Sequence, residues 1–209
     1  MNTETLERII YFWTQYKDLF QWVFVIVVAV LVFSFERKTK EKQRQIFQEL
    51  ALLHNGQIIK KRFFDSPQVK FPYLDKEITI SYGSRGEHDR SETILQYPMS
   101  SASHYWLTLN FGASLNSLGK LFGLKYLLIG NQEFDSVYRI NTNDELKTRN
   151  FLSYDIQFKL LELKDIKPTL VISDKKFIFT VFKEFRTLDE YRPFVEAGLT
   201  FVRKLKTVL

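Results

Sequence analysis

The longest apolar segment of the chain lies near its N-terminus. Residues 19–35 read LFQWVFVIVVAVLVFSF and contain no charged residue. As a helix, this segment is about 25 Å long at 1.5 Å per residue, roughly a turn short of a ~30 Å hydrocarbon core. A buried strand or core helix is the alternative, but a strand rarely exceeds ~10 residues and a core helix usually carries a polar stripe. The pattern therefore predicts a transmembrane helix over residues 19–35.

Aromatic and basic residues flank this segment. Tyr16 and Trp22 are expected to anchor it at the interface, where amphipathic aromatic side chains gather. Residues 1–18 carry two basic residues and residues 36–44 carry five, so the positive-inside rule predicts a single-pass protein of the cell membrane with its C-terminal bulk in the cytoplasm. The basic run also argues against a cleaved signal peptide. The five residues predicted to contact anionic lipid headgroups are Arg37, Lys38, Lys40, Lys42 and Arg44.

The segments on either side of residues 19–35 have helical spacing of apolar residues. Residues 1–18 form a short tail, and two interpretations of it stay open: an interfacial helix with its aromatic face in the headgroup layer, or an extension of the spanning helix. Residues 36–56 predict a basic stalk helix, since Ile46, Phe47 and Leu50 repeat at helical spacing. Asn55-Gly56 supplies a left-handed stop for this helix.

Residues 57–112 have the pattern of a sheet. Five segments are rich in β-branched and aromatic residues, and HYWLTLNFG at 104–112 alternates strictly between apolar and polar positions. Their short connections favour antiparallel pairing over a doubly wound parallel sheet. The other predicted strands are 57–64, 68–74, 76–83 and 91–98.

The remainder of the chain mixes helices and strands. Thr142 and Thr187 each begin a capping box that predicts a helix, and Ser153 is expected to cap another over 154–163. The further predictions are a short helix or irregular turn at 113–123, a strand at 125–130, a turn into a strand at 133–141, a hairpin at 169–185 across 173–176, and a final helix with Phe194, Leu199, Val202 and Leu205 on its apolar face.

Together these patterns predict an α+β protein with an N-terminal transmembrane helix followed by a mostly antiparallel sheet packed with several helices. About 165 residues are enough for one domain with its own core. The predicted organisation is a tail at 1–18, a transmembrane helix at 19–35, a stalk at 36–56 and a soluble α+β domain at 57–209.

Residues 119–163 contain a Gly-x-x-x-Phe-Asp turn, an aromatic-x-aliphatic strand and an Asn-Asp helix start. This pattern resembles the shared block of a group of uncharacterised bacterial single-pass membrane-anchored proteins. The resemblance implies an anchor plus a soluble α+β domain of unknown role, and it adds no chemistry. The residues that match the pattern are Gly130, Phe134, Asp135, Tyr138, Ile140, Asn143 and Asp144.

The residue types present exclude several kinds of chemistry. The chain has no cysteine, so it has no disulfide, cysteine zinc site, iron–sulfur cluster or cysteine nucleophile. His54, His88 and His104 lack the spacing of a metal site, and the chain contains neither a Walker nor a dinucleotide-binding glycine motif. We therefore predict no catalytic residue, no cofactor and no metal ligand.

The net charge of +6 points to a membrane surface rather than to nucleic acid. Residues 36–44 hold five basic and two acidic residues, which is half of the excess, and they would lie next to the lipid headgroups. No basic-aromatic platform typical of nucleic-acid binding is present. Lys60, Lys61 and Arg62 form a second basic patch that either contacts lipid or an acidic partner, or protects an edge strand from pairing.

Glu133 and Asp135 are the most conspicuous carboxylate pair. We favour a structural interpretation in which Asp135 accepts hydrogen bonds from turn amides while Phe134 enters the core. The resulting functional hypothesis is a cytoplasmic membrane-tethered interaction or scaffold domain that binds another protein, a lipid headgroup or itself. The alternative is a membrane-anchored enzyme, such as a hydrolase, that uses Asp135 or Asp144. Self-association through the valine-rich helix is a third option, although the helix lacks a Gly-x-x-x-Gly face.

Overall fold

The computed structural model describes residues 3–59, 67–84, 91–99, 104–112 and 126–209 of the 209-residue chain. The chain divides into two compact units, Met1–Lys42 and Gln43–Leu209. The first unit consists of helix α1, Thr3–Leu53, whose C-terminal turns belong to the second unit. The second unit is an α+β domain.

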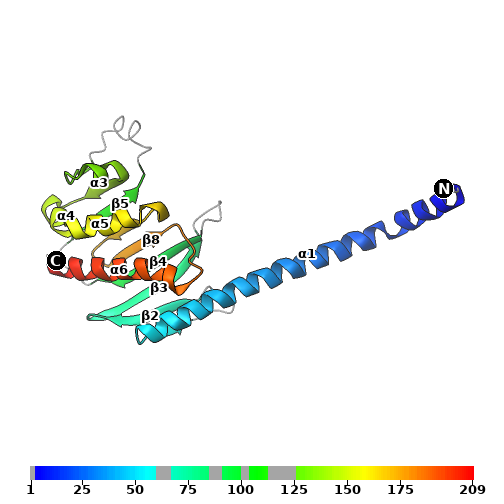
Figure 1. Ribbon diagram of the computed structural model, residues 1–209, viewed down its shortest axis with the longest axis horizontal. Helices are drawn as coiled ribbons and strands as arrows, with labels where there is room; N and C mark the ends of the chain where they lie inside the picture. The colour runs from blue at the N-terminus through cyan, green and yellow to red at the C-terminus, as the bar shows by residue number, and fades with distance from the viewer. Residues whose placement is uncertain (1–2, 60–66, 85–90, 100–103, 113–125) are drawn as a thin grey trace. The chain divides into compact units, whose positions relative to one another are not determined.

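The domain is built on one eight-stranded sheet with the order β1-β2-β3-β4-β8-β7-β5-β6 (Figure 1). Every neighbouring pair is antiparallel, so the predicted antiparallel sheet is confirmed. The hairpin β7–β8 joins the N-terminal meander to β5 and β6. The strands are β1 Gln57–Ile59, β2 Gln68–Tyr73, β3 Lys76–Ser84, β4 Ser91–Pro98, β5 Leu107–Phe111, β6 Tyr138–Thr142, β7 Thr169–Ile172 and β8 Lys176–Val181.

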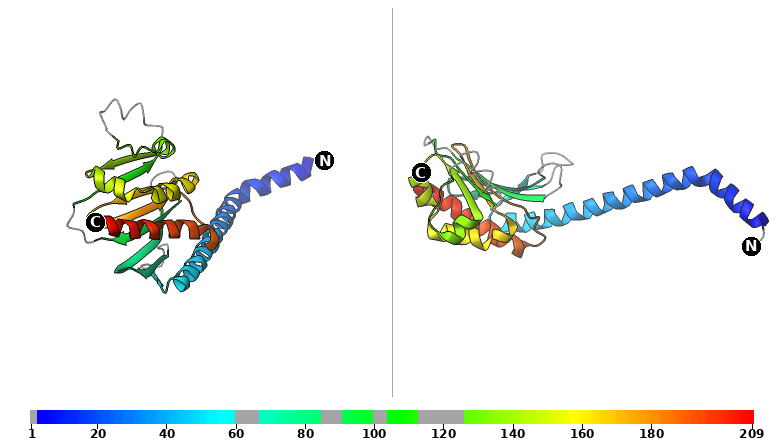
Figure 2. Two further views of the ribbon diagram at one scale, coloured as in Figure 1. Left: turned by 60° about the vertical axis from the view of Figure 1, so that its left-hand side comes forward. Right: turned by 90° about the horizontal axis from the view of Figure 1, so that it is seen from above.

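Helices lie over one face of this sheet (Figure 2). α4, α5 and α6 cover this face together with the C-terminal turns of α1, and no described helix covers the opposite face. We call the two sides the covered face and the uncovered face. The helices after α1 are α3 Gln132–Val137, α4 Glu145–Phe151, α5 Tyr154–Glu162, the short 3-10 helix η1 Lys164–Ile166, and α6 Leu188–Val208.

The core lies between α6 and the covered face. Phe179 of β8 stacks on Phe194 with ring centroids 4.9 Å apart and meets Phe201 edge-on at 5.0 Å. A Cβ added to Gly198 would lie 2.5 Å from Cδ1 of Leu95, so glycine is what allows α6 to approach β4 this closely. The predicted apolar face of the last helix is thereby confirmed as a core-forming surface.

The predicted end of the first helix and the Thr187 cap are both confirmed. Asn55 has a φ of 51°, and the Gly56 amide donates a 2.7 Å hydrogen bond to the Ala51 carbonyl, which ends α1. The Thr187 hydroxyl accepts the Glu190 amide hydrogen bond at the start of α6. Each of these signals lies within a few residues of the atoms that it binds, which is why the sequence alone revealed it.

Several local predictions near residue 130 are wrong. Residues 126–130 do not form a strand. The Leu127 amide donates a 3.0 Å hydrogen bond to the Ile140 carbonyl, but this bond does not continue into a ladder. The predicted turn at 133 is the short helix α3. The N-cap of α4 is Asp144 rather than Thr142, since the Asp144 carboxylate accepts the Lys147 amide. Residues 60–64 and 113–123, for which a strand end and a short helix or turn were predicted, lie outside the described residues.

The transmembrane helix predicted over residues 19–35 requires correction. Among the described residues, no helix has both the length and the apolar composition that crossing a membrane requires. α1 is 51 residues long, but it does not meet both conditions. The fold class that the structure supports is α+β with an eight-stranded antiparallel sheet.

Candidate functional site

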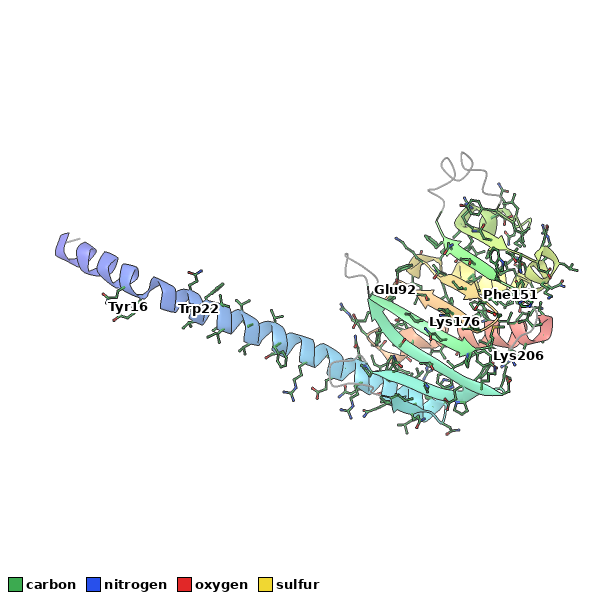
Figure 3. The ribbon with its side chains drawn as sticks, turned by 180° about the vertical axis from the view of Figure 1, so that it is seen from behind. Tyr16, Trp22, Glu92, Phe151, Lys176 and Lys206 are labelled. Atoms are coloured by element: carbon green, nitrogen blue, oxygen red, sulfur yellow. The ribbon has the colours of Figure 1, made fainter. Side chains whose placement is uncertain are left out.

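The first candidate surface is the apolar part of α1. Every residue from Gln21 to Ser34 is exposed, and eleven large apolar side chains between Trp22 and Phe33 are 41–69% exposed. They occur on all sides of the helix, unlike α6, which buries one face. Together with Trp22, Tyr16 is also exposed, at 41% (Figure 3). We call residues Trp22–Phe33 the apolar segment.

Basic residues follow the apolar segment along α1. Arg37, Lys42 and Arg44 are exposed, whereas the side chains of Lys38 and Lys40 lie outside the described part of the chain. The second basic patch at residues 60–62 and the His88 loop lie outside it as well. The structure therefore places three of the five predicted headgroup-contacting residues at the protein surface.

Asp135 has the structural role that the sequence predicted. Its Oδ1 accepts a 3.0 Å hydrogen bond from the Ile129 amide and its Oδ2 accepts one of 2.9 Å from the Gly130 amide. Phe134 is fully buried next to the ring of Tyr138, with centroids 4.7 Å apart. Both carboxylate oxygens thus hold the segment before α3, so the geometry gives Asp135 a backbone-bracing role rather than that of an acid or base.

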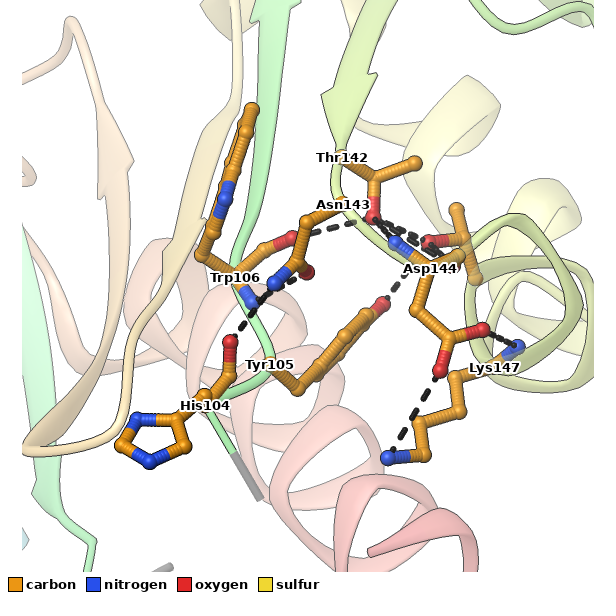
Figure 4. Close-up of polar contacts among 8 residues, drawn as sticks. His104, Tyr105, Trp106, Thr142, Asn143, Asp144 and Lys147 are labelled. Carbon is orange, nitrogen blue, oxygen red and sulfur yellow. Dashed lines mark hydrogen bonds and ion pairs between the residues drawn. The ribbon is translucent and has the colours of Figure 1, made fainter. Parts of the chain in front are cut away.

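Asn143 and Asp144 belong to a polar network that joins β6, β5 and α4 (Figure 4). The Asn143 amide group donates to the His104 carbonyl at 2.6 Å and accepts from the Trp106 amide at 2.9 Å. It thereby holds the backbone around His104, whose φ is 46°. The Asp144 carboxylate accepts the Lys147 amide at 2.9 Å and caps α4. Both side chains therefore act on the backbone of their own domain.

Buried hydroxyl groups complete this network. The Tyr105 hydroxyl lies 3.0 Å from Oγ1 of Thr148, which donates to Oγ1 of Thr142 at 2.8 Å. Burial raises the pKa of Tyr105 to about 12, so this phenol keeps its proton at neutral pH. The Lys147 ammonium lies 5.9 Å from the centre of the Tyr105 ring. This cluster could not be predicted from the sequence, because its members come from three separate parts of the chain.

Two further titratable groups have shifted pKa values. The Tyr97 hydroxyl donates a 2.6 Å hydrogen bond to Asp75, whose other carboxylate oxygen lies 3.0 Å from the Lys206 ammonium. The Tyr97 hydrogen bond, followed by Lys206, lowers the pKa of Asp75 to about 2. Burial lowers the pKa of His54, whose ring stacks on Phe71 at 4.6 Å. The first contact ties the β2–β3 turn to α6, and the second ties the end of α1 to β2.

A shallow groove of about 240 Å³ lies beside His54, between the last turns of α1 and the N-terminal half of α6, within the second unit. Its lining is mixed, with apolar leucine and valine next to an arginine and a glutamate. Within the described residues, no group of histidines and carboxylates is arranged to hold a metal ion. The residues that line the groove are Leu50, Leu53, His54, Arg192, Val195 and Glu196.

One residue on the uncovered face was not anticipated from the sequence. Glu92 is only 5% exposed, and among the residues that the structure describes its Oε1 has no hydrogen-bond partner. A polar residue in an alternating strand normally lies on the solvent side, so a glutamate at position 92 did not predict burial. The neighbours of Glu92 depend on the pairing of strands that are distant in the sequence, and a local pattern does not predict this pairing.

Comparison with known proteins identifies a fold but no family. No protein-family model matches the chain, and no curated protein matches it significantly. Among solved structures, the chain is similar to the crystal structure of the mycobacterial trehalose monomycolate transport factor A, TtfA, with a TM-score of 0.50 and 11% sequence identity. The match covers 83% of this chain and 95% of the TtfA chain. At this identity the similarity concerns the fold alone, and the suggested resemblance to bacterial membrane-anchored proteins stays a prediction.

Proposed function

We propose that this chain is a membrane-associated binding protein, in which the apolar segment of α1 contacts lipid and the α+β domain binds another protein. The observation that carries the proposal is the exposure of eleven large apolar side chains between Trp22 and Phe33. Transferring them from water to an apolar phase is worth on the order of 10 kcal/mol. Exposed apolar patches of this kind mark membrane or protein contact sites.

The basic residues after the apolar segment support lipid over a second protein as its partner. Arg37, Lys42 and Arg44 are exposed and would lie at the level of the headgroups. Each basic side chain near an anionic surface contributes about 1 kcal/mol. The predicted orientation of the domain toward the cytoplasm assumed a spanning helix, so it is not carried into this proposal.

The described carboxylates give the enzyme alternative little support. Asp135 and Asp144 were its proposed catalytic residues, and backbone amides occupy oxygens of both. The fold similarity to TtfA, a protein described as a trehalose monomycolate transport factor, is compatible with a binding role. The proposal nevertheless rests on the exposed apolar segment and not on that likeness.

Vesicle flotation tests the lipid contact. The full chain carrying Trp13→Phe and Trp106→Phe keeps Trp22 as its only tryptophan. We expect this protein to float with vesicles that contain anionic lipid, and the Trp22 emission to shift to shorter wavelength. Val27→Asp should abolish flotation, because it places a charge in the middle of the apolar segment.

The matched control is Leu52→Asp, which alters an even more exposed apolar residue of α1 outside the segment and should leave flotation unchanged. Replacing Arg37, Lys42 and Arg44 together by Ala should weaken binding to anionic vesicles about 100-fold and leave weak binding to neutral vesicles. A full chain that stays at the bottom of the gradient with both vesicle types would contradict the proposal.

A further inference from the structure

The uncovered face of the sheet has an organised pattern of side chains. Along β4, the residues Thr93, Leu95 and Tyr97 point to the core, so Glu92, Ile94 and Gln96 point to the uncovered face. Most of this face is polar, as expected for the solvent side of an antiparallel sheet. Its small polar side chains are half-buried at Thr79, Thr108 and Thr169 and buried at Ser81 and Thr180.

An apolar stripe crosses this polar background diagonally. Ile94 pairs with Thr180, and Ile178 lies two residues further along β8. Ile178 pairs directly with Val171 of β7, which pairs with Thr108 of β5. Two residues before Thr108, Trp106 is 43% exposed, and alternation with buried Tyr105 and Leu107 places it on the uncovered face. We call Ile94, Ile178, Val171 and Trp106 the diagonal stripe.

Glu92 lies at one end of the diagonal stripe. It precedes Ile94 by two residues on the same strand and face, and it pairs with Gly83 of β3. The residue is 95% buried, yet its Oε1 has no hydrogen-bond partner within the described ranges of the chain. A buried carboxylate oxygen that has lost water without gaining a partner is costly, so its retention indicates a partner that arrives from outside.

The opposite end of the stripe carries a positive charge. Lys176 pairs with Pro98 and lies on the uncovered face, where it is exposed (Figure 3). The distance from Glu92 to Trp106 covers three strand spacings and six residues along the strands, which is about 25 Å. A helix of about 17 residues has this length. The face is therefore apolar along a line, with an acidic group at one end and a basic group at the other.

We propose that the uncovered face binds an amphipathic helix of a partner protein, with a lysine or arginine near the N-terminal end of that helix reaching Glu92. This inference rests on the proposed function and specifies its protein-binding half. Charge complementarity fixes the direction, because Lys176 then meets the negative C-terminal end of the helix dipole. The apolar face of the partner helix covers the diagonal stripe.

A helix fits this surface better than an extended peptide does. β4, β8, β7 and β5 are each paired on both sides, so their backbone groups are unavailable for strand addition. A helix satisfies its own backbone and requires only side-chain contacts from the sheet. A lipid surface would leave the threonine and serine hydroxyls of this face without partners.

The test uses two synthetic helical peptides of about 17 residues. They carry leucines on one face and no tryptophan, and they differ only by Lys or Gln in the first turn. The protein is the full chain with Trp13→Phe and Trp22→Phe, so that Trp106 is the only reporter, and no lipid is present. We expect the Trp106 emission to shift to shorter wavelength, with about tenfold tighter binding of the Lys peptide.

Glu92→Gln should remove the preference for the Lys peptide. The matched control Glu77→Gln changes an exposed glutamate on the same face and should retain the preference. Ile178→Thr, which keeps a β-branched residue in the strand, should lower the affinity for both peptides by the same factor. The inference fails if neither peptide binds, if the wild type shows no preference, or if the preference survives Glu92→Gln. Because no lipid is present, loss of vesicle binding would not alter this result.

Discussion

The two faces of the sheet follow the same alternation but use it differently. The covered face presents large side chains such as Phe71, Phe177 and Phe179, which are fully buried against helices. The uncovered face presents threonines, a half-buried aliphatic stripe and a buried glutamate without a full set of partners. The first pattern stabilises the domain, whereas the second costs stability and creates a surface that another molecule can complete.

Substitutions at two adjacent residues of β8 test this difference, and we expect them to have the largest effect on stability. Phe179 is fully buried between Phe194 and Phe201, whereas Ile178 points to the uncovered face and is half-buried. Phe179→Ala should lower the free energy of unfolding by about 3–5 kcal/mol, because it leaves a cavity in the aromatic core. Ile178→Ala should lower it by only about 1 kcal/mol. Urea unfolding of the full chain measures both values.

Equal losses from the two substitutions would contradict the distinction between the faces. They would mean that Ile178 is as tightly packed as Phe179. An alanine at Ile178 that destabilises little but weakens peptide binding would sharpen the distinction, since it would separate stability from binding along one strand.

The sequence predicted the covered face well. The strands at 68–73, 76–84 and 91–98 and the hairpin β7–β8 were found because they are rich in β-branched and aromatic residues and turn residues separate them. Thr187 was found because a cap and its amide partner are three residues apart. Both kinds of signal are local, so the chain itself contains what is needed to read them.

The sequence did not predict features that depend on distant neighbours. The diagonal stripe exists only because β8 lies between β4 and β7, a pairing that no local pattern states. Residues 19–35 were interpreted as a membrane span from their apolar composition, but no helix in the described part of the chain has both the length and the apolar composition of a span. Residues 125–130 are apolar enough for a strand, yet Leu127 makes a single ladder-like hydrogen bond to β6.

Glu92 gives the second test, of intermediate size. Glu92→Met replaces the buried carboxylate by an apolar side chain of similar length, which removes an oxygen atom that has no partner. We expect the free energy of unfolding to rise by about 1 kcal/mol, because the cost of the unsatisfied polar group disappears. The melting temperature should rise by about 2–4 °C. Glu77→Met, at an exposed position of the same face, is the control and should change little.

A loss of stability in Glu92→Met would show that this carboxylate already has a stabilising role within the isolated chain. The uncovered face would then resemble the covered face in being optimised for folding. A gain of stability together with a loss of the Lys-peptide preference would instead identify a residue retained for binding at the expense of stability.

Asp75 gives the smallest test and shows a carboxylate with the opposite environment. Its oxygens are bound by the Tyr97 hydroxyl and the Lys206 ammonium at the rim of the covered face. Because these contacts lower the pKa of Asp75 from 3.8 to about 2, they stabilise the folded state above pH ~4. This contribution is lost as the pH falls toward 2, where the carboxylate becomes protonated in the folded state as well.

Asp75→Asn should therefore lower the melting temperature slightly at neutral pH, and the difference from the wild type should shrink between pH 4 and pH 2. Asp174→Asn, in the turn between β7 and β8, is the control for a hairpin aspartate. A difference that stays constant down to pH 2 would mean that the Asp75 contacts act through shape and not through charge. Asp75 has two partners, whereas Oε1 of Glu92 has none among the described residues. Because Asp75 is exposed and solvent screens its charge, we expect Asp75→Asn to change the melting temperature less than Glu92→Met does.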